Sequence, residues 1–261
     1  MIRPIFALCA ALVAAAPLVW AEEARLRVAL DPGHGGSDPG AEASGLDEAT
    51  LVLDFARRLK AVLDETGVLV AVLTRDTDER VDLDRRLTIA RQAGAGVFIS
   101  LHADALEEGD GSASGVTVYT LADQEVWRAD RRLMERHAGD DLLSGVDLTG
   151  AGDDIALTLF DLARRDTMPR SQTLASRIIR SFDAGDLAVN SRPHRHGGFA
   201  VLKAADMPSI LLELGFLSSA RDRERMTSEA WLTRAAEAVR DGLLLWYDED
   251  RLRTDGTGHR E

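Results

Sequence analysis

Short apolar runs alternate along the chain with longer stretches whose apolar residues recur every three or four positions. Apolar runs that close on Gly, Pro or polar residues predict β-strands, and the longer spacing predicts amphipathic helices. We expect strands at 26–30, 68–73, 96–101, 115–121, 199–202 and 209–212. We expect helices at 49–64, 83–93, 171–182 and 231–247. A charged and mostly helical stretch, 122–169, interrupts this alternation.

Strands that alternate with helices of this length form right-handed βαβ units and a parallel sheet. We therefore expect an α/β fold, a three-layer sandwich in which helices flank a mostly parallel twisted sheet, with residues 122–169 as an inserted helical segment. A chain of 261 residues suits one such domain at 22–248. The last residues, 249–261, form a polar tail that we expect to fray.

The first 21 residues have the pattern of a secretory signal peptide. Arg3 supplies a positive charge, residues 5–19 are almost wholly apolar, and Val19 and Ala21 are small residues at the positions that determine cleavage. This apolar stretch is shorter than the ~20 residues that a membrane-spanning helix needs. We expect an exported protein without a stable membrane anchor.

Charge and cysteine content narrow the classes of function. The formal net charge of −13 argues against nucleic acid and anionic lipid as partners, because both require a basic surface. The only cysteine, Cys9, lies in the signal segment and leaves with it. Any metal site of the mature chain must therefore use histidine and carboxylate ligands.

Three predicted strands end in ionisable residues, His34, His102 and Glu213, and Glu48 opens the first predicted helix. Ligands of open parallel sheets bind beyond the carboxyl ends of the strands, so these side chains should converge. Two histidines and one carboxylate with an open position form a common catalytic zinc shell.

Each of these residues also has an ordinary explanation when it is taken alone. His34 suits a glycine-rich turn, His102 suits a hydrogen-bonded core histidine, and Glu48 suits the first turn of a helix, where acidic residues are favoured. Glu213 is more telling, because a carboxylate within the apolar run 210–214 must be paired, bound to metal or functional. Their joint placement favours a metal centre.

A serine-hydrolase triad is the alternative within one strand. Ser100, His102 and Asp104 point to the same face by two-residue alternation. Such neighbours lie roughly 7 Å apart, which is too far for a direct Ser–His hydrogen bond. A triad also requires its members to converge from separate elements.

Several segments together resemble the zinc-dependent N-acetylmuramoyl-L-alanine amidases (amidase type 3), in particular the division-associated bacterial branch. The matching motifs are Leu30–Gly36, Gly45–Glu48, Ile99–Ala105, Phe199–Lys203 and Pro208–Ser218. The resemblance runs from about Leu26 to Tyr247, with Asp47 and Ala49 in place of the basic residues that often flank the Glu ligand.

This resemblance implies one Zn²⁺ held by His34, Glu48 and His102, with Glu213 as the catalytic base. It implies hydrolysis of the amide bond between N-acetylmuramic acid and L-alanine of peptidoglycan, in the periplasm, for wall remodelling and daughter-cell separation. We expect a monomer. His194 and His196 are expected in the substrate groove or on the surface rather than as ligands.

The segment 122–169 resembles the part of division amidases that folds over the zinc until an activator of the LytM type displaces it. On this comparison His137 is the candidate inhibitory ligand, and Glu135 is the alternative. A solvated histidine on a charged helix explains His137 equally well.

Two other classes of function remain open at this stage: a non-catalytic wall-binding or activator protein, and a zinc hydrolase of free peptides or small amides. The intact set of His34, Glu48, His102 and Glu213 argues against the first.

Overall fold

The computed structural model describes residues 25–104, 114–123 and 153–257. The predicted signal peptide, His137 and Glu135 lie outside these residues, and the roles assigned to them stay predictions. The described strands are β1 (Leu26–Pro32), β2 (Glu42–Ala43), β3 (Leu46–Asp47), β4 (Leu69–Leu73), β5 (Val97–His102), β6 (Val116–Leu121), β7 (Val189–Gly197) and β8 (Ser209–Glu213). The helices are α2 (Glu48–Asp64), α3 (Leu83–Gln92), α5 (Asp153–Ala184), η1 (Ala200–Leu202), α6 (Ala220–Met226) and α7 (Glu229–Thr257).

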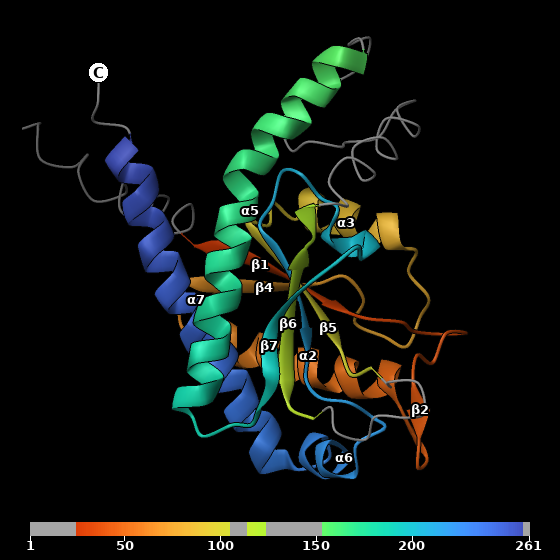
Figure 1. The fold of residues 1–261 in the computed structure, drawn as a ribbon. Helices are drawn as coiled ribbons and strands as arrows, with labels where there is room; N and C mark the ends of the chain where they lie inside the picture. The colour runs from red at the N-terminus through yellow and green to blue at the C-terminus, as the bar shows by residue number, and fades with distance from the viewer. Residues whose placement is uncertain (1–24, 105–113, 124–152, 258–261) are drawn as a thin grey trace, which may run out of the picture.

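The centre of the fold is a six-stranded sheet in the order β4-β1-β5-β8-β6-β7 (Figure 1). The strands β4, β1, β5 and β8 are parallel. The strand β6 runs antiparallel to β8, and β7 pairs in parallel with β6. The expected mostly parallel sheet is confirmed.

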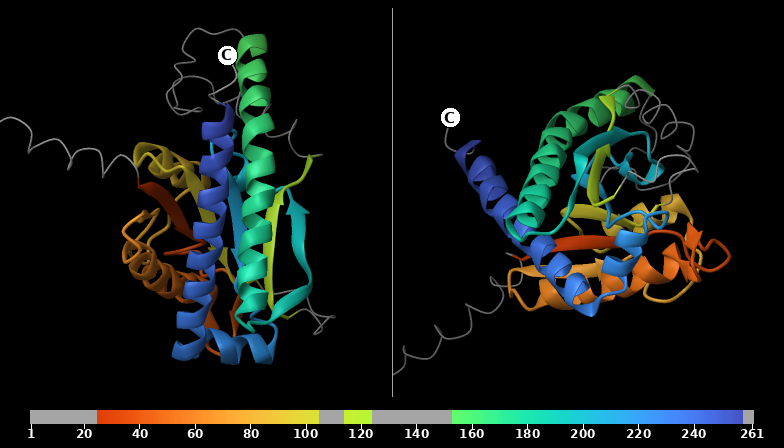
Figure 2. Two further views of the ribbon diagram at one scale, coloured as in Figure 1. Left: turned by 90° about the vertical axis from the view of Figure 1, so that its left-hand side faces the viewer. Right: turned by 60° about the horizontal axis from the view of Figure 1, so that its bottom comes forward.

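Helices cover both faces of the sheet, as Figure 2 shows. On one face α2, α7 and the second half of α5 bury the larger core, to which Leu30, Ile99, Val118 and Leu212 point. On the other face α3, η1 and the chain that follows η1 cover a smaller core around Phe98. The expected three-layer α/β sandwich is confirmed, with layers of unequal thickness.

In the segment before β8 one prediction was wrong and one strand was missed. Residues 199–202 form a 3-10 turn rather than a strand, in which Lys203 N–H donates to Ala200 O (3.1 Å). Apolar runs this short bury equally well in either conformation, so the pattern alone does not distinguish them. The strand β7 was not predicted, because Pro193 and its basic and polar neighbours lack the apolar alternation of a strand.

Both long helices extend beyond their predicted ends. The helix α7 continues to Thr257, into the polar stretch that was expected to fray. The helix α5 begins at Asp153 and runs through Pro169 without a break. Among the described residues, neither these helices nor any other is apolar enough over a sufficient length to cross a membrane.

The first half of α5 belongs to the folded body. Phe160 is fully buried and packs with Ala205, and Thr167 Oγ1 donates to Ala205 O (2.8 Å). Arg164 Nη2 donates to Lys203 O (2.8 Å). The expected boundary of the insertion at residue 169 therefore falls inside a packed helix, and a deletion that tests the insertion should leave residues from 153 onward in place.

Candidate metal centre and active site

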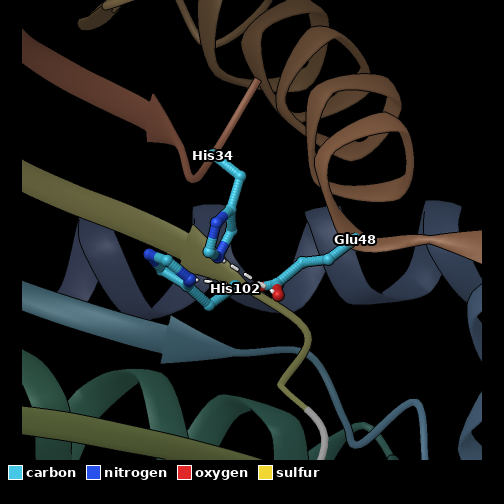
Figure 3. Close-up of side chains that lie close together, drawn as sticks. All are labelled: His34, Glu48 and His102. Atoms are coloured by element: carbon cyan, nitrogen blue, oxygen red, sulfur yellow. Dashed lines mark hydrogen bonds and ion pairs between the residues drawn. The ribbon is translucent and has the colours of Figure 1, made fainter. Parts of the chain in front are cut away.

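Three side chains from three elements meet at the carboxyl edge of the sheet: His34 after β1, His102 at the end of β5 and Glu48 at the start of α2 (Figure 3). One ligand atom from each lies within 4.8 Å of the others. The N-cap of α2 is Asp47, whose Oδ1 accepts from Thr50 N–H (2.8 Å), and this cap fixes where the helix places Glu48.

Glu48 is the centre of this group. Its Oε2 lies 3.2 Å from His34 Nε2, and its Oε1 lies 2.9 Å from His102 Nδ1. Backbone N–H groups of Ala41 (3.0 Å) and Ala103 (2.9 Å) also donate to this carboxylate. Burial opposes ionisation of Glu48, but the hydrogen bonds from both histidines prevail and hold its pKa well below the usual range.

The histidines respond to the same carboxylate. The hydrogen bond to Glu48 raises the pKa of His34 to about 9 against the opposing effect of burial. On the other side of this ring, Nδ1 lies 3.1 Å from Asp38 Oδ1. This contact is an ion-pair distance without hydrogen-bond geometry, and the charge of Asp38 adds to the rise in the pKa of His34.

The backbone leaves room for this group at two glycines. A Cβ on Gly33 would lie 2.4 Å from His102 Cε1, and a Cβ on Gly40 would lie 2.6 Å from Glu48 Oε2. Two imidazoles and one carboxylate are ligands that divalent transition metals accept. The three residues therefore fit a metal ion, and they are the only such group among the residues that the structure describes.

Two buried arginines hold the loop that carries His34. Arg86 donates to His34 O and Pro32 O (both 2.6 Å), and Arg75 donates to Gly33 O (2.7 Å) and Ala49 O (2.8 Å). Arg75 thereby ties the loop to the first turn of α2, next to Glu48. His34 itself has a left-handed backbone (φ 59°), which an L-residue keeps only when its surroundings impose it.

Ser100 belongs to the hydrogen-bond network that holds this loop, and not to a catalytic triad. Its Oγ donates to Asp31 Oδ2 (2.8 Å), and Asp31 Oδ1 accepts from Thr74 Oγ1 (2.6 Å) and Arg86 Nη1 (2.8 Å). With the Ser100 hydroxyl committed to Asp31 rather than to His102, the serine-hydrolase alternative is wrong.

Glu213 ends β8 directly beside His102 on β5. Its side chain is 4% exposed, and Oε2 accepts from Asp104 N–H (3.0 Å). Burial raises the pKa of Glu213 to about 7. A carboxyl group with a pKa near neutrality suits a group that both takes and gives a proton.

A cleft of about 310 Å³ opens beside the candidate metal centre. His34 and His102 line it together with Arg80, Leu83 and Val201. It lies on the face of the sheet that α3 and η1 cover, so the metal centre borders open space on that side.

His194 and His196 lie elsewhere, on β7. Both rings share the hydroxyl of Thr120, at 3.1 Å from His194 Nε2 and 3.0 Å from His196 Nδ1. Neither belongs to the group of His34, Glu48 and His102. Their expected place in a groove or on the surface stays a prediction.

The supporting residues Asp38 and Asp31, and the packing roles of Arg75 and Arg86, were not predicted from the sequence. Asp38 follows His34 by four positions in a glycine-rich loop, and that spacing is the one local signal for it. The two arginines gave no local signal, because charged side chains in loops and helix starts are normally solvated.

The α/β sandwich and its His–Glu–His group define a protein with a candidate metal-dependent active site at the edge of a mostly parallel sheet. The sequence profile described as N-acetylmuramoyl-L-alanine amidase matches residues 28–244. The chain therefore belongs to the N-acetylmuramoyl-L-alanine amidase family, and it is a peptidoglycan amidase.

Individual relatives agree with this assignment. The chain is 32% identical over 229 residues to the N-acetylmuramoyl-L-alanine amidase AmiA of Escherichia coli K12, covering 86% of this chain and 78% of the relative. It is 34% identical over 224 residues to AmiC of Neisseria meningitidis serogroup B, covering 83% of this chain and 51% of the relative.

Solved structures have the same fold. The amidase AmiC2 of Nostoc punctiforme superposes with a TM-score of 0.59 at 28% identity, covering 85% of this chain and 97% of that one. The amidase of Clostridium difficile 630 gives a TM-score of 0.62 at 25% identity, covering 86% and 98%.

Proposed function

We propose that the chain hydrolyses the amide bond between N-acetylmuramic acid and L-alanine with one Zn²⁺ held by His34, Glu48 and His102. The observation that carries this proposal is the meeting of these three side chains next to a buried carboxyl group, Glu213, on the adjacent strand. The family indicates which bond is cut. The two imidazoles and one carboxylate are ligands that zinc commonly has in catalytic sites.

A zinc ion held by these residues would lower the pKa of its bound water to about 7 and would polarise a carbonyl group. Glu213 then takes the proton of the attacking water and delivers it to the nitrogen of the leaving L-alanine. General acid–base help of this kind contributes about 10²–10⁴-fold. The hydrogen bond from Asp104 N–H holds the carboxyl group in place between the two transfers.

The remaining residues of the site support these groups. Asp38 places a negative charge beside the ring of His34, and Arg75 and Arg86 fix the loop between β1 and α2. The cleft beside His34 offers space for the muramyl side of the substrate, with Leu83 and Arg80 on its wall.

We further propose that the chain acts in the periplasm, after removal of residues 1–21, in wall remodelling and daughter-cell separation. An activator of the LytM type that displaces the segment 122–169, and an inhibitory contact of His137, belong to the same proposal. Its support is the division-associated type of the relatives AmiA and AmiC.

The test is dye release from labelled sacculi by the mature chain, its Glu213→Gln variant and a Glu224→Gln control at an exposed position. Glu213→Gln should lose about 10²–10⁴-fold in rate and keep its zinc, because Glu213 acts on protons and not as a ligand. Chelator should abolish release by the parent chain.

Two results would contradict the proposal. Hydrolysis by Glu213→Gln at the parental rate would remove Glu213 from the mechanism. Zinc-loaded, folded protein that releases no stem peptide, both as the parent chain and after deletion of residues 122–152, would favour the non-catalytic wall-binding alternative.

A further inference from the structure

We propose that Arg195, with Tyr119 beside it, binds a carboxylate of the stem peptide on the side of Glu213 that faces away from the metal centre. The inference rests on the proposed function and adds to it a subsite that selects acidic peptides. Its basis is the register of four strands that are adjacent in the sheet, in the order β5, β8, β6 and β7.

The register places these side chains on one face of the sheet, with Tyr119 and Arg195 at the level of Leu211, two residues before Glu213. His102 pairs with Glu213 across β5 and β8, and Glu213 pairs with Thr117 across β8 and β6. Tyr119, two residues after Thr117, is the partner of Arg195 on β7. Because side chains alternate along a strand and directly paired residues share a face, all five point to the same face of the sheet.

The guanidinium of Arg195 reaches back towards Glu213. Its Nη2 donates to Asn190 Oδ1 and its Nε donates to Arg192 O (both 3.3 Å). Asn190 is buried and follows Val189, the partner of Val116 at the start of β6. The cation therefore lies close to the level along the sheet at which Glu213 ends β8.

This cation lacks an acidic partner within the described part of the chain. No carboxylate of those residues lies within ion-pair distance of Arg195, although the protein carries a formal charge of −13. Arg195 is half-buried, whereas Arg192 on the same strand is exposed. A half-buried guanidinium that keeps free donors suits a planar anion such as a carboxylate.

Tyr119 lies on β6, the strand between β7 and β8, and pairs with Arg195 on one side and Leu211 on the other. Its ring packs edge-on against Phe199, with ring centroids 5.1 Å apart. Burial raises the pKa of Tyr119, the charge of Arg195 opposes this rise, and the charge of Glu213 adds to it. The phenol therefore lies near both groups and stays a neutral hydrogen-bond donor at physiological pH.

The chemistry decides which part of the substrate lies here. Glu213 must give its proton to the nitrogen of the leaving L-alanine, so this nitrogen lies next to Glu213. The stem peptide therefore extends from the scissile bond past Glu213, away from the metal centre. The cleft on the other side, along His34 and Leu83, is left for the muramyl group. Arg195 then meets the peptide and not the glycan.

The separation of Glu213 and Arg195 matches the length of the stem peptide from the leaving nitrogen to the carboxyl group of its second residue. The strands β8 and β7 are separated by β6, so their backbones lie about 10 Å apart. Arg195 is at the level of Leu211, two residues or about 7 Å before Glu213, so the two backbone positions are about 12 Å apart. From the leaving nitrogen to the α-carboxyl carbon of the next residue an extended peptide spans about 7 Å. Hydrogen bonds of about 3 Å at each end bring this span to about 13 Å, close to the separation of the two positions.

The test uses two soluble muropeptides that differ only in the α-carboxyl group of the second stem residue, a free carboxylate in one and a carboxamide in the other. We expect the parent chain to cleave the carboxylate form with about tenfold higher kcat/KM, the usual scale for one charge-assisted pair. Arg195→Gln should lose this preference through a higher KM for the carboxylate form only.

Arg192→Gln removes a charge from the same strand and should keep the preference, and Arg195→Lys should keep part of it. Equal cleavage of both muropeptides by the parent chain, or an unchanged preference in Arg195→Gln, would overturn the subsite alone. A loss of the same size in Arg192→Gln would assign the effect to overall charge and also overturn it. Release of stem peptide from neither muropeptide, by the parent chain or by a folded variant that lacks residues 122–152, would overturn the proposed function and the subsite with it.

Discussion

Replacing Arg86 by Met should destabilise the fold strongly, because Arg86 is a buried cation that holds the loop carrying His34. Its side chain is 3% exposed and pairs with the fully buried Asp31 (2.8 Å). It also donates to Val81 O (2.9 Å), Pro32 O and His34 O (both 2.6 Å). Methionine fills much of the volume but supplies none of these donors.

The magnitude follows from the charge that is left behind. Removing one partner of a buried ion pair costs about 3–5 kcal/mol, because the other charge stays buried and uncompensated. In Arg86→Met, Asp31 still accepts from the hydroxyls of Thr74 and Ser100, which places the cost near the lower end, at about 3 kcal/mol. For a domain of this size, that loss lowers Tm by roughly 6–12 °C.

The assay is thermal unfolding followed by circular dichroism, in chelator, so that metal binding does not contribute. Arg85→Met is the matched control, because Arg85 is exposed and precedes Arg86 in α3. The control should stay within about 0.5 kcal/mol of the parent chain. The double variant Asp31→Asn/Arg86→Met should recover part of the loss, since no charge is left unpaired. A Tm of Arg86→Met equal to that of Arg85→Met would refute this reasoning.

Three further predictions follow from the site. Gly33→Ala should weaken zinc binding in a chelator competition, because the new Cβ would lie 2.4 Å from the ring of His102; unchanged affinity would show that the ring has room to move. Thr117→Val should raise the free energy of unfolding in urea by about 1 kcal/mol, because the buried Thr117 hydroxyl has no hydrogen-bond partner among the described residues; a loss of stability would reveal a partner. His102→Ala should abolish zinc retention measured by mass spectrometry, and His194→Ala should not, since only His102 lies in the three-residue group; zinc loss in both would contradict the site.

The elements with regular patterns were predictable. The strands that became β1, β4, β5, β6 and β8 show apolar runs closed by glycine, proline or polar residues, and α2 and α3 show helical spacing. Because the carboxyl ends of parallel strands meet at one edge, the pattern also predicted that His34, His102 and Glu213 would approach one another. The structure brings these residues together, with Glu48 between the histidines.

Elements without such a pattern were not predictable. The strand β7 has few apolar residues and owes its conformation to pairing with β6, which is a long-range contact. The run 199–202 folds as a 3-10 turn because the chain must cross from β7 to β8 over the smaller core. Intrinsic propensity is too weak to decide either case against tertiary packing.

The sequence by itself determined the class of fold, and it predicted the edge of the sheet at which the candidate site lies and the residues that meet there, because periodicity and strand ends are local properties. The tertiary structure alone decided how those residues are held. The pairing of Arg86 with Asp31, the hydrogen bond from Arg75 to the start of α2, and the pairing of Arg195 with Tyr119 all join distant segments. Such contacts depend on which strands become neighbours and which side chains lose water, and no local pattern records either.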